Sequence, residues 1–246
     1  RVHKDNVEQW YQIVSDQLLN PGWREDDFKR LKKEQIDGIK AGLKASNDEE
    51  LGKEVLYHKL YQNHSYESYN YGDLSDLESI TLDDVKAFYQ QQLTQSKLNL
   101  GLTGAIPADL KQQMLADFAR LPKGEGKRLN IADAPILKGH HATIIEKNTQ
   151  STAVSFGFPI DVVRDHKDWA ALWLVRSYLG EHRSSNSHLF KRIRQVRGMN
   201  YGDYAYIEYF PRGMFQTKPD ANLGRSEQIF QVWIRPLRNN NDAHFA

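Results

Sequence analysis

Five residues in the second half of the chain come close to a zinc-binding motif. Tyr178-Leu-Gly-Glu-His182 has the spacing of H-x-x-E-H, in which two histidines one helical turn apart hold zinc and the glutamate acts on the metal-bound water. Here tyrosine occupies the first ligand position, and Gly180 followed by polar residues predicts that the helix ends inside the motif. We therefore interpret Glu181-His182 as a helix terminus, with His182 solvated or capping, and assign no metal ligand to it.

Other catalytic chemistries find no support in the sequence. The chain has no cysteine, which excludes disulfides, thiolate catalysis and cysteine-ligated metals. It contains no G-x-S-x-G motif, glycine-rich phosphate loop or dinucleotide fingerprint. His140-His141 has no partner one helical turn away, and we interpret the remaining histidines as surface or packing residues. The sequence predicts no catalytic residue and no cofactor in this chain.

A basic segment and an aromatic segment follow the zinc-like motif. The basic residues form one helix face, which taken alone is typical of solvated charge. The tyrosines could stack nucleic-acid bases, but they alternate with Asp203 and Glu208, which favours packing in a core or at a strand edge. The residues concerned are Lys191, Arg192, Arg194 and Arg197, followed by Tyr201, Tyr204, Tyr206 and Tyr209.

Length and composition restrict the class of protein. With 246 residues, 39% of them hydrophobic, the chain can bury a core. Its 33 Lys and Arg against 32 Asp and Glu give no global field, so we expect no nucleic-acid partner. No apolar run reaches the roughly 18 residues that span a bilayer, so we expect no membrane span. Arg1 is neither a methionine nor part of a signal sequence, and Asp242 is placed to cap a new helix, so we expect a piece of a longer protein.

Hydrophobic periodicity changes along the chain. Between 122 and 140, proline, glycine and mixed charge indicate a linker. We expect helices at 7–18, 25–43, 48–60, 82–89, 109–120, 169–179 and 187–196. Gly198 is expected to end the last of these helices. We expect strands at 98–103, 142–145, 152–158, 201–210 and 228–234. Capping boxes are expected at Ser75 and Thr81. The fold class is therefore α+β, with helices layered on largely antiparallel sheets and two partial domains, 1–121 and 141–246, joined by the linker 122–140.

From Thr149 to Tyr209 the order of these features resembles the non-catalytic domain of the insulinase/pitrilysin family of zinc metallopeptidases, of the mitochondrial processing peptidase-like kind. The resemblance rests on Gly157-Phe-Pro159, on Ser187-x-Leu-Phe-x-x-Ile-Arg194 and on Gly198-Met-Asn-Tyr201. In that family an arginine and a tyrosine of the second domain reach the substrate and the developing oxyanion. By resemblance, Arg194 and Tyr201 are the substrate-binding residues. A guanidinium and a phenol are directional donors suited to that role.

The first half also resembles this family, as the second half of a zinc-bearing domain. The family's H-x-x-E-H would precede residue 1, so the resemblance implies a fragment without its histidine pair or general base. The family's third zinc ligand is a glutamate seven residues after another glutamate. If Glu34 is the earlier one, the ligand position falls on Ala41. A shift of one turn would instead place it on Asp37 or Glu34. The resemblance therefore implies a zinc-free chain, although an active parent protein would hold zinc.

Two functions follow from the resemblance. In the first, the chain is the scaffold and substrate-binding part of a zinc peptidase. It is inactive by itself and binds a peptide or unfolded protein substrate. In the second, it belongs to a non-enzymatic member that binds extended peptides or serves as the structural partner of an active peptidase subunit, which Ala41 favours. The resemblance weakly favours a bacterial periplasmic or otherwise extracytoplasmic location.

Overall fold

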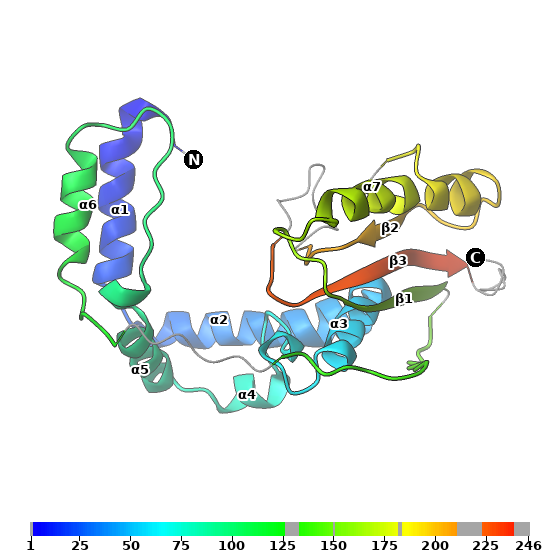
Figure 1. The fold of residues 1–246 in the computed structure, drawn as a ribbon. Helices are drawn as coiled ribbons and strands as arrows, with labels where there is room; N and C mark the ends of the chain where they lie inside the picture. The colour runs from blue at the N-terminus through cyan, green and yellow to red at the C-terminus, as the bar shows by residue number, and fades with distance from the viewer. Residues whose placement is uncertain (1, 126–132, 150, 182–183, 211–222, 239–246) are drawn as a thin grey trace. The chain divides into compact units, whose positions relative to one another are not determined.

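The chain folds into two compact units that are not consecutive in sequence. In the computed structural model the described residues are 2–125, 133–149, 151–181, 184–210 and 223–238. The first unit comprises residues 1–36 and 74–130, and the second comprises residues 37–73 and 131–246. Figure 1 shows the helices and strands of each.

The first unit is helical. Its helices are α1 (Val7–Leu19), α2 (Glu25–Asp37), α4 (Leu74–Ser79), α5 (Leu82–Gln92) and α6 (Leu110–Phe118), with short 3-10 turns at Lys4–Asn6 and Gln95–Lys97. Within this unit α1 and α6 lie side by side. Val7 and Tyr11, one turn apart on α1, are buried against Leu110, Met114 and Phe118 of α6. The pairing of these two apolar faces forms the core of the unit.

Polar contacts fix the same helices in place. The Tyr11 hydroxyl donates to Asp117 at 2.9 Å, and burial together with that carboxylate raises the pKa of Tyr11 to about 12. At the start of α5 the Thr81 side chain accepts from the Asp84 amide while the Asp84 carboxylate accepts from the Thr81 amide. This capping box confirms the prediction at Thr81. The box predicted at Ser75 is wrong, because α4 begins at Leu74 and Ser75 lies inside the helix instead of before it.

The second unit is built on a three-stranded antiparallel sheet of order β1-β3-β2. The strands are β1 (Ser151–Ile160), β2 (Asp203–Tyr206) and β3 (Gln228–Arg238). Gly157 of β1 lies opposite Gln231, and Ala205 of β2 lies opposite Val232. The register shifts once between Thr152 and Val154, which marks a bulge in β1. The central strand β3 therefore organises this unit.

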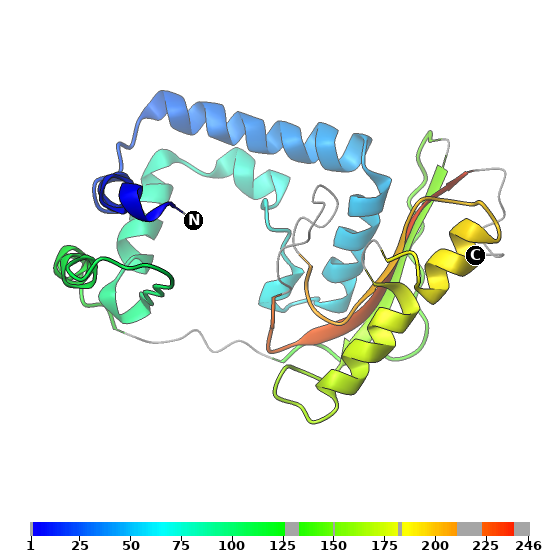
Figure 2. The ribbon, with the colours of Figure 1, turned by 90° about the horizontal axis from the view of Figure 1, so that it is seen from above.

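Helices cover both faces of this sheet, as Figures 1 and 2 show. α3 (Asp48–Leu60) packs on β1 and β3, and α7 (Trp169–Gly180) packs on β2. The remaining helical segments of the unit are Gly38–Ala45 (η2), which continues α2 with π-helical turns, Ser65–Glu67 (η3) and Phe190–Gln195 (η5). Asn47 caps α3 by accepting a hydrogen bond from the Glu50 amide.

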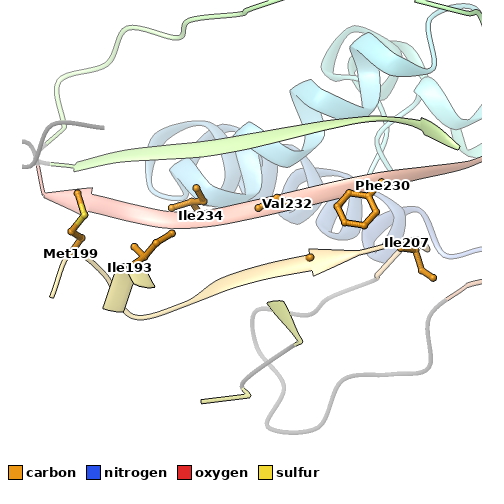
Figure 3. Close-up of a cluster of buried hydrophobic side chains, with 7 residues drawn as sticks. Ile193, Met199, Ile207, Phe230, Val232 and Ile234 are labelled. Atoms are coloured by element: carbon orange, nitrogen blue, oxygen red, sulfur yellow. The ribbon is translucent and has the colours of Figure 1, made fainter. Parts of the chain in front are cut away.

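Alternate residues of β3 serve different cores. Phe230, Val232 and Ile234 join the cluster with Ile193 and Met199 that is drawn in Figure 3. On the opposite side of the sheet, Ile229 packs with Tyr57 of α3 and with Tyr61, the residue after α3. Trp233 packs on this side with Tyr206 of β2. Because successive side chains of a strand point to opposite faces, a strand covered on both sides is buried without interruption. This explains the unbroken burial from Gln228 to Ile234.

The predicted fold class is confirmed, with helices layered on an antiparallel sheet. All the predicted helices are present, although the segment predicted at 187–196 is mostly π-helical. The strands predicted at 98–103 and 142–145 are wrong, since neither segment pairs with a strand among the described residues. An alternating pattern shows that one face of a segment could be buried. A strand also needs a neighbouring strand for its backbone hydrogen bonds. β2 is shorter than the predicted 201–210, and β3 is longer than 228–234.

The sequence-based division into 1–121, 122–140 and 141–246 concerns the domains of a parent protein and stays a prediction. In the structure, α3 lies with the sheet although it precedes the predicted linker. The predicted helix cap at Asp242 lies outside the described residues. Over the segments that the structure describes, no helix combines the length and apolar character of a membrane span.

Candidate functional site

The helix that carries Tyr178 ends before the zinc-like spacing is complete. α7 stops at Gly180, and the next residue, Glu181, already has extended backbone angles of φ −67° and ψ 142°. A side chain at position 180 would not fit, because its Cβ would lie 2.8 Å from the backbone nitrogen of Ala205 in β2. The predicted helix end is therefore confirmed, and close packing on β2 is its physical reason.

The other members of the motif serve structural contacts. Glu181 accepts a hydrogen bond from the buried Arg176 at 3.3 Å. Burial lowers the pKa of the Arg176 guanidinium, and the charge of Glu181 opposes that shift. Tyr178 is exposed and stacks on His188 with 5.8 Å between ring centroids. His182 lies outside the described residues.

A short helical segment, η5, lies between this helix end and β2. Ile193, at 0% exposure, anchors η5 in the core with Met199 and Ile234; Figure 3 shows all three. The Gly198 amide donates to the Arg194 carbonyl at 2.9 Å, and the Met199 amide donates to the Ile193 carbonyl at 3.2 Å. Gly198 adopts φ +64°, as predicted for a glycine after a helix. The chain thus reverses and returns toward Tyr201 and β2.

This reversal brings together the two residues that the sequence singled out. The Arg194 guanidinium carbon lies 4.2 Å from the centroid of the Tyr201 ring, and it lies 4.8 Å from that of Phe190. Tyr201 is 76% exposed, and Arg194 is partly exposed. Just beyond, the buried Asn200 side chain donates to Asp203 at 2.6 Å and fixes the connection to β2. Arg194 and Tyr201 therefore form one solvent-facing pair, and its substrate role stays a prediction.

Stacking determines what Arg194 can bind. The Arg194 guanidinium lies over the rings of Phe190 and Tyr201, and its N–H groups are directional hydrogen-bond donors. An arginine held in this way is suited to bind a carbonyl or carboxylate oxygen. Sequence reasoning missed Phe190, although its spacing of four residues before Arg194 on a helix was a signal for the contact.

The residues predicted near a third zinc ligand do not form a metal site. Ala41 is exposed on η2, and its methyl group cannot ligate a metal; its carbonyl accepts from the Ser46 hydroxyl at 2.8 Å. Glu34 pairs with Arg30 at 3.0 Å in solvent. Among the described residues, no group of three or more histidines, aspartates or glutamates could hold a metal ion. The donor set needed for zinc is not provided by these residues.

One polar cluster in the second unit had no sequence signal. The Arg225 guanidinium lies between two rings, 4.3 Å from the centroid of Tyr66 and 3.8 Å from that of Tyr209. Asn70 donates to the Tyr209 hydroxyl. Near this cluster, burial followed by the charge of Glu50 raises the pKa of Glu54 to about 7. These residues come from distant parts of the chain, so only folding brings them together.

Comparison with known proteins identifies one family. The model described as the peptidase M16 inactive domain matches residues 79–242. A non-peptidase homolog, YmxG of Helicobacter pylori, is 23% identical over 211 residues, which is 83% of this chain and 48% of that protein. A probable inactive metalloprotease, YmfF of Bacillus subtilis, is 19% identical over 251 residues, which is 98% of this chain and 56% of that protein. The chain thus spans about half the length of these relatives.

Solved structures share the fold. A peptidase M16 inactive domain from Pseudomonas fluorescens superposes with a TM-score of 0.73 at 23% identity, covering 96% of this chain and 52% of that one. A structure described as a protease from Helicobacter pylori gives a TM-score of 0.71 at 14% identity, covering 97% and 53%. At these identities the likeness establishes the fold alone.

Proposed function

Because this chain belongs to the peptidase M16 inactive-domain family, we propose that it is a non-catalytic peptide-binding wall, in which Arg194 and Tyr201 contact an extended peptide. The observation that carries the proposal is the solvent-facing stack of these two side chains on a segment anchored by the fully buried Ile193. A rigidly anchored arginine loses little conformational freedom on binding, so its hydrogen bonds contribute more to affinity.

The chemistry of the pair fits a peptide backbone. In this proposal the edge of the Arg194 guanidinium donates to a peptide carbonyl, and the Tyr201 hydroxyl donates to a neighbouring one. The proposal includes binding and no hydrolytic step, because no group of three or more histidines, aspartates or glutamates among the described residues could hold a metal ion. Binding without turnover agrees with the names of the two curated relatives, which describe a non-peptidase and an inactive metalloprotease.

Peptide affinity tests the proposal directly. Fluorescence anisotropy of a labelled, unstructured peptide should report saturable binding to the chain. We expect Arg194→Ala to weaken it by about 1.5–3 kcal/mol, the range for a hydrogen bond to a charged group. Tyr201→Phe separates the hydroxyl from the ring, because the ring that stacks on Arg194 is retained. Circular dichroism and the urea midpoint should stay close to those of the unchanged chain, because both side chains project into solvent.

The matched control is Arg120→Ala, which removes an exposed arginine from the other unit. Equal affinity of the Arg194→Ala variant, the Arg120→Ala variant and the unchanged chain would remove the assigned role. Elemental analysis adds an independent check. One zinc per chain, or peptide cleavage that a chelator abolishes, would contradict a non-catalytic wall.

A second candidate function is that of structural partner to an active peptidase subunit. Ala41 favours it, because alanine at the position inferred for the third zinc ligand removes catalysis while leaving the fold intact. Under this alternative a catalytic relative should form a stable complex with the chain, measured by analytical ultracentrifugation. Peptide binding by the chain alone would then be absent, which separates the two candidates.

A further inference from the structure

Charge is distributed unevenly around the stacked arginine. From residue 182 to residue 202 the sequence contains no aspartate or glutamate, although the whole chain is almost neutral. Four cationic residues of this stretch lie on or just after η5: Lys191, Arg192, Arg194 and Arg197. The first acidic residue that follows, Asp203, is 1% exposed and belongs to the core side of β2. We call these four residues, with Tyr201, the basic platform.

Three cations of the basic platform, Lys191, Arg192 and Arg194, are available to a ligand. Lys191 and Arg192 are exposed and Arg194 partly so, and none of the three forms an ion pair with a carboxylate within the part of the chain that the structure describes. Other exposed cations of the chain form ion pairs: Arg30 pairs with Glu34 at 3.0 Å, and Arg24 pairs with Asp27 at 2.5 Å. A helix face with several unneutralised charges of one sign attracts ligands of the opposite sign.

From this geometry we propose that the basic platform selects extended peptides that carry acidic side chains. The inference rests on the proposed peptide-binding function and adds to it a preference for one class of peptide. Arg194 binds the peptide, and Lys191 and Arg192, three and two positions earlier on the same segment, attract its aspartate and glutamate carboxylates. Because Lys191, Arg192 and Arg194 lie close together on this segment, they suit several carboxylates of a peptide better than a single terminal carboxylate.

Nucleic acid is a weaker candidate for the same surface. Phosphate backbones are bound by many cations spread along a groove, with several aromatic rings for the bases. The basic platform offers one short segment and one exposed ring, Tyr201, while Tyr204 and Tyr206 are buried in the core. The near-neutral whole chain provides no wider positive field.

Three labelled peptides of equal length and similar hydropathy test the preference. One carries spaced aspartates and glutamates, one their amides and one lysines, and all have acetylated and amidated ends so that no terminal charge contributes. We expect the acidic peptide to bind at least about fivefold more tightly than its amide counterpart at low salt, with the difference shrinking at 0.5 M salt. The lysine peptide should bind most weakly.

Charge reversal then locates the preference. Lys191→Glu with Arg192→Glu should abolish the advantage of the acidic peptide while the amide peptide keeps its affinity. The control with the same change in net charge is Lys111→Glu with Arg120→Glu, two exposed cations of the other unit, and it should keep the advantage.

The outcomes distinguish the two proposals. If all three peptides bind equally and Arg194→Ala weakens all of them, the charge preference is wrong and peptide binding stands. If no peptide binds, both proposals fail. If an oligonucleotide displaces the acidic peptide at a lower concentration than an acidic competitor peptide does, the platform recognises nucleic acid and the inference is overturned.

Discussion

Replacing Glu54 with glutamine should change how the stability of the second unit depends on pH. Glu54 lies on α3, and the charges that act on it come from Glu50 and Lys53 on the same helix and from Arg225. The hydroxyls of Tyr69 and Tyr209 also lie within its electrostatic reach. Burial is the largest influence and the negative charge of Glu50 the next, while the two cations oppose them. The balance favours the protonated carboxyl group in the folded chain.

The magnitude follows from the shift in pKa. The pKa of Glu54 rises from 4.5 to about 7 in the folded state. The folded chain therefore binds the proton more tightly than the unfolded chain, so this stabilisation is complete below pH 4.5 and is lost as the pH rises through 7. A difference of about 2.5 pKa units corresponds to about 3 kcal/mol, an upper limit because the side chain is only partly buried.

The assay needs a signal from the second unit alone. The Trp233 indole N–H, which donates to Gln231 at 2.9 Å in the buried core, gives a resolved NMR resonance that disappears on unfolding. Urea unfolding followed at this resonance should show that the unchanged chain loses up to about 2.5 kcal/mol more than Glu54→Gln between pH 5 and pH 8. Glutamine keeps the shape of the protonated glutamate and cannot ionise.

The control for this experiment is Glu8→Gln, an exposed carboxylate on α1 in the other unit. It should reproduce the pH dependence of the unchanged chain. A Glu54→Gln variant with the same pH dependence as the unchanged chain would refute the reasoning. So would a carbon-13 titration of the Glu54 carboxyl group with a midpoint below pH 5.

Three further substitutions test the packing of the second unit by urea unfolding. Lys53→Met should cost about 3–5 kcal/mol, because Lys53, 3% exposed, pairs with the buried Glu49 at 3.6 Å and the substitution breaks this buried ion pair. Gly157→Ala should cost about 1–3 kcal/mol, because the added Cβ would lie 2.5 Å from the Phe230 carbonyl oxygen of β3; an unchanged urea midpoint would contradict this contact. Gly38→Ala, in a helical segment with open space around it, should instead stabilise by about 0.5–1 kcal/mol.

Local rules predicted local features of this chain. Thr81 and Asp84 are three residues apart at the start of a helix, and a capping box needs only that spacing at a helix N-terminus. Gly198 ends its helix for a similarly local reason, since glycine adopts a positive φ without steric cost. Arg194 and Tyr201 were singled out by resemblance alone, and their contact across that glycine is seen only in the structure.

Features that depend on distant partners could not be predicted in this way. Residues 98–103 and 142–145 alternate like strands, but neither finds a ladder partner among the described residues. The pKa of Glu54 is raised mainly by burial, which exists only in the folded chain, and Arg225, far away in sequence, opposes the shift.

The sequence by itself determined where most of the helices form, because hydrogen bonds within one or two turns and local capping residues set them. Only the tertiary structure decided that α3 covers one face of the sheet and α7 packs on β2. It also decided that Arg194 lies against Phe190 and Tyr201 in solvent while its neighbour Ile193 is buried. The physical reason is that burial and the interaction of charges depend on the distances between residues in space. These distances are set only when the chain folds.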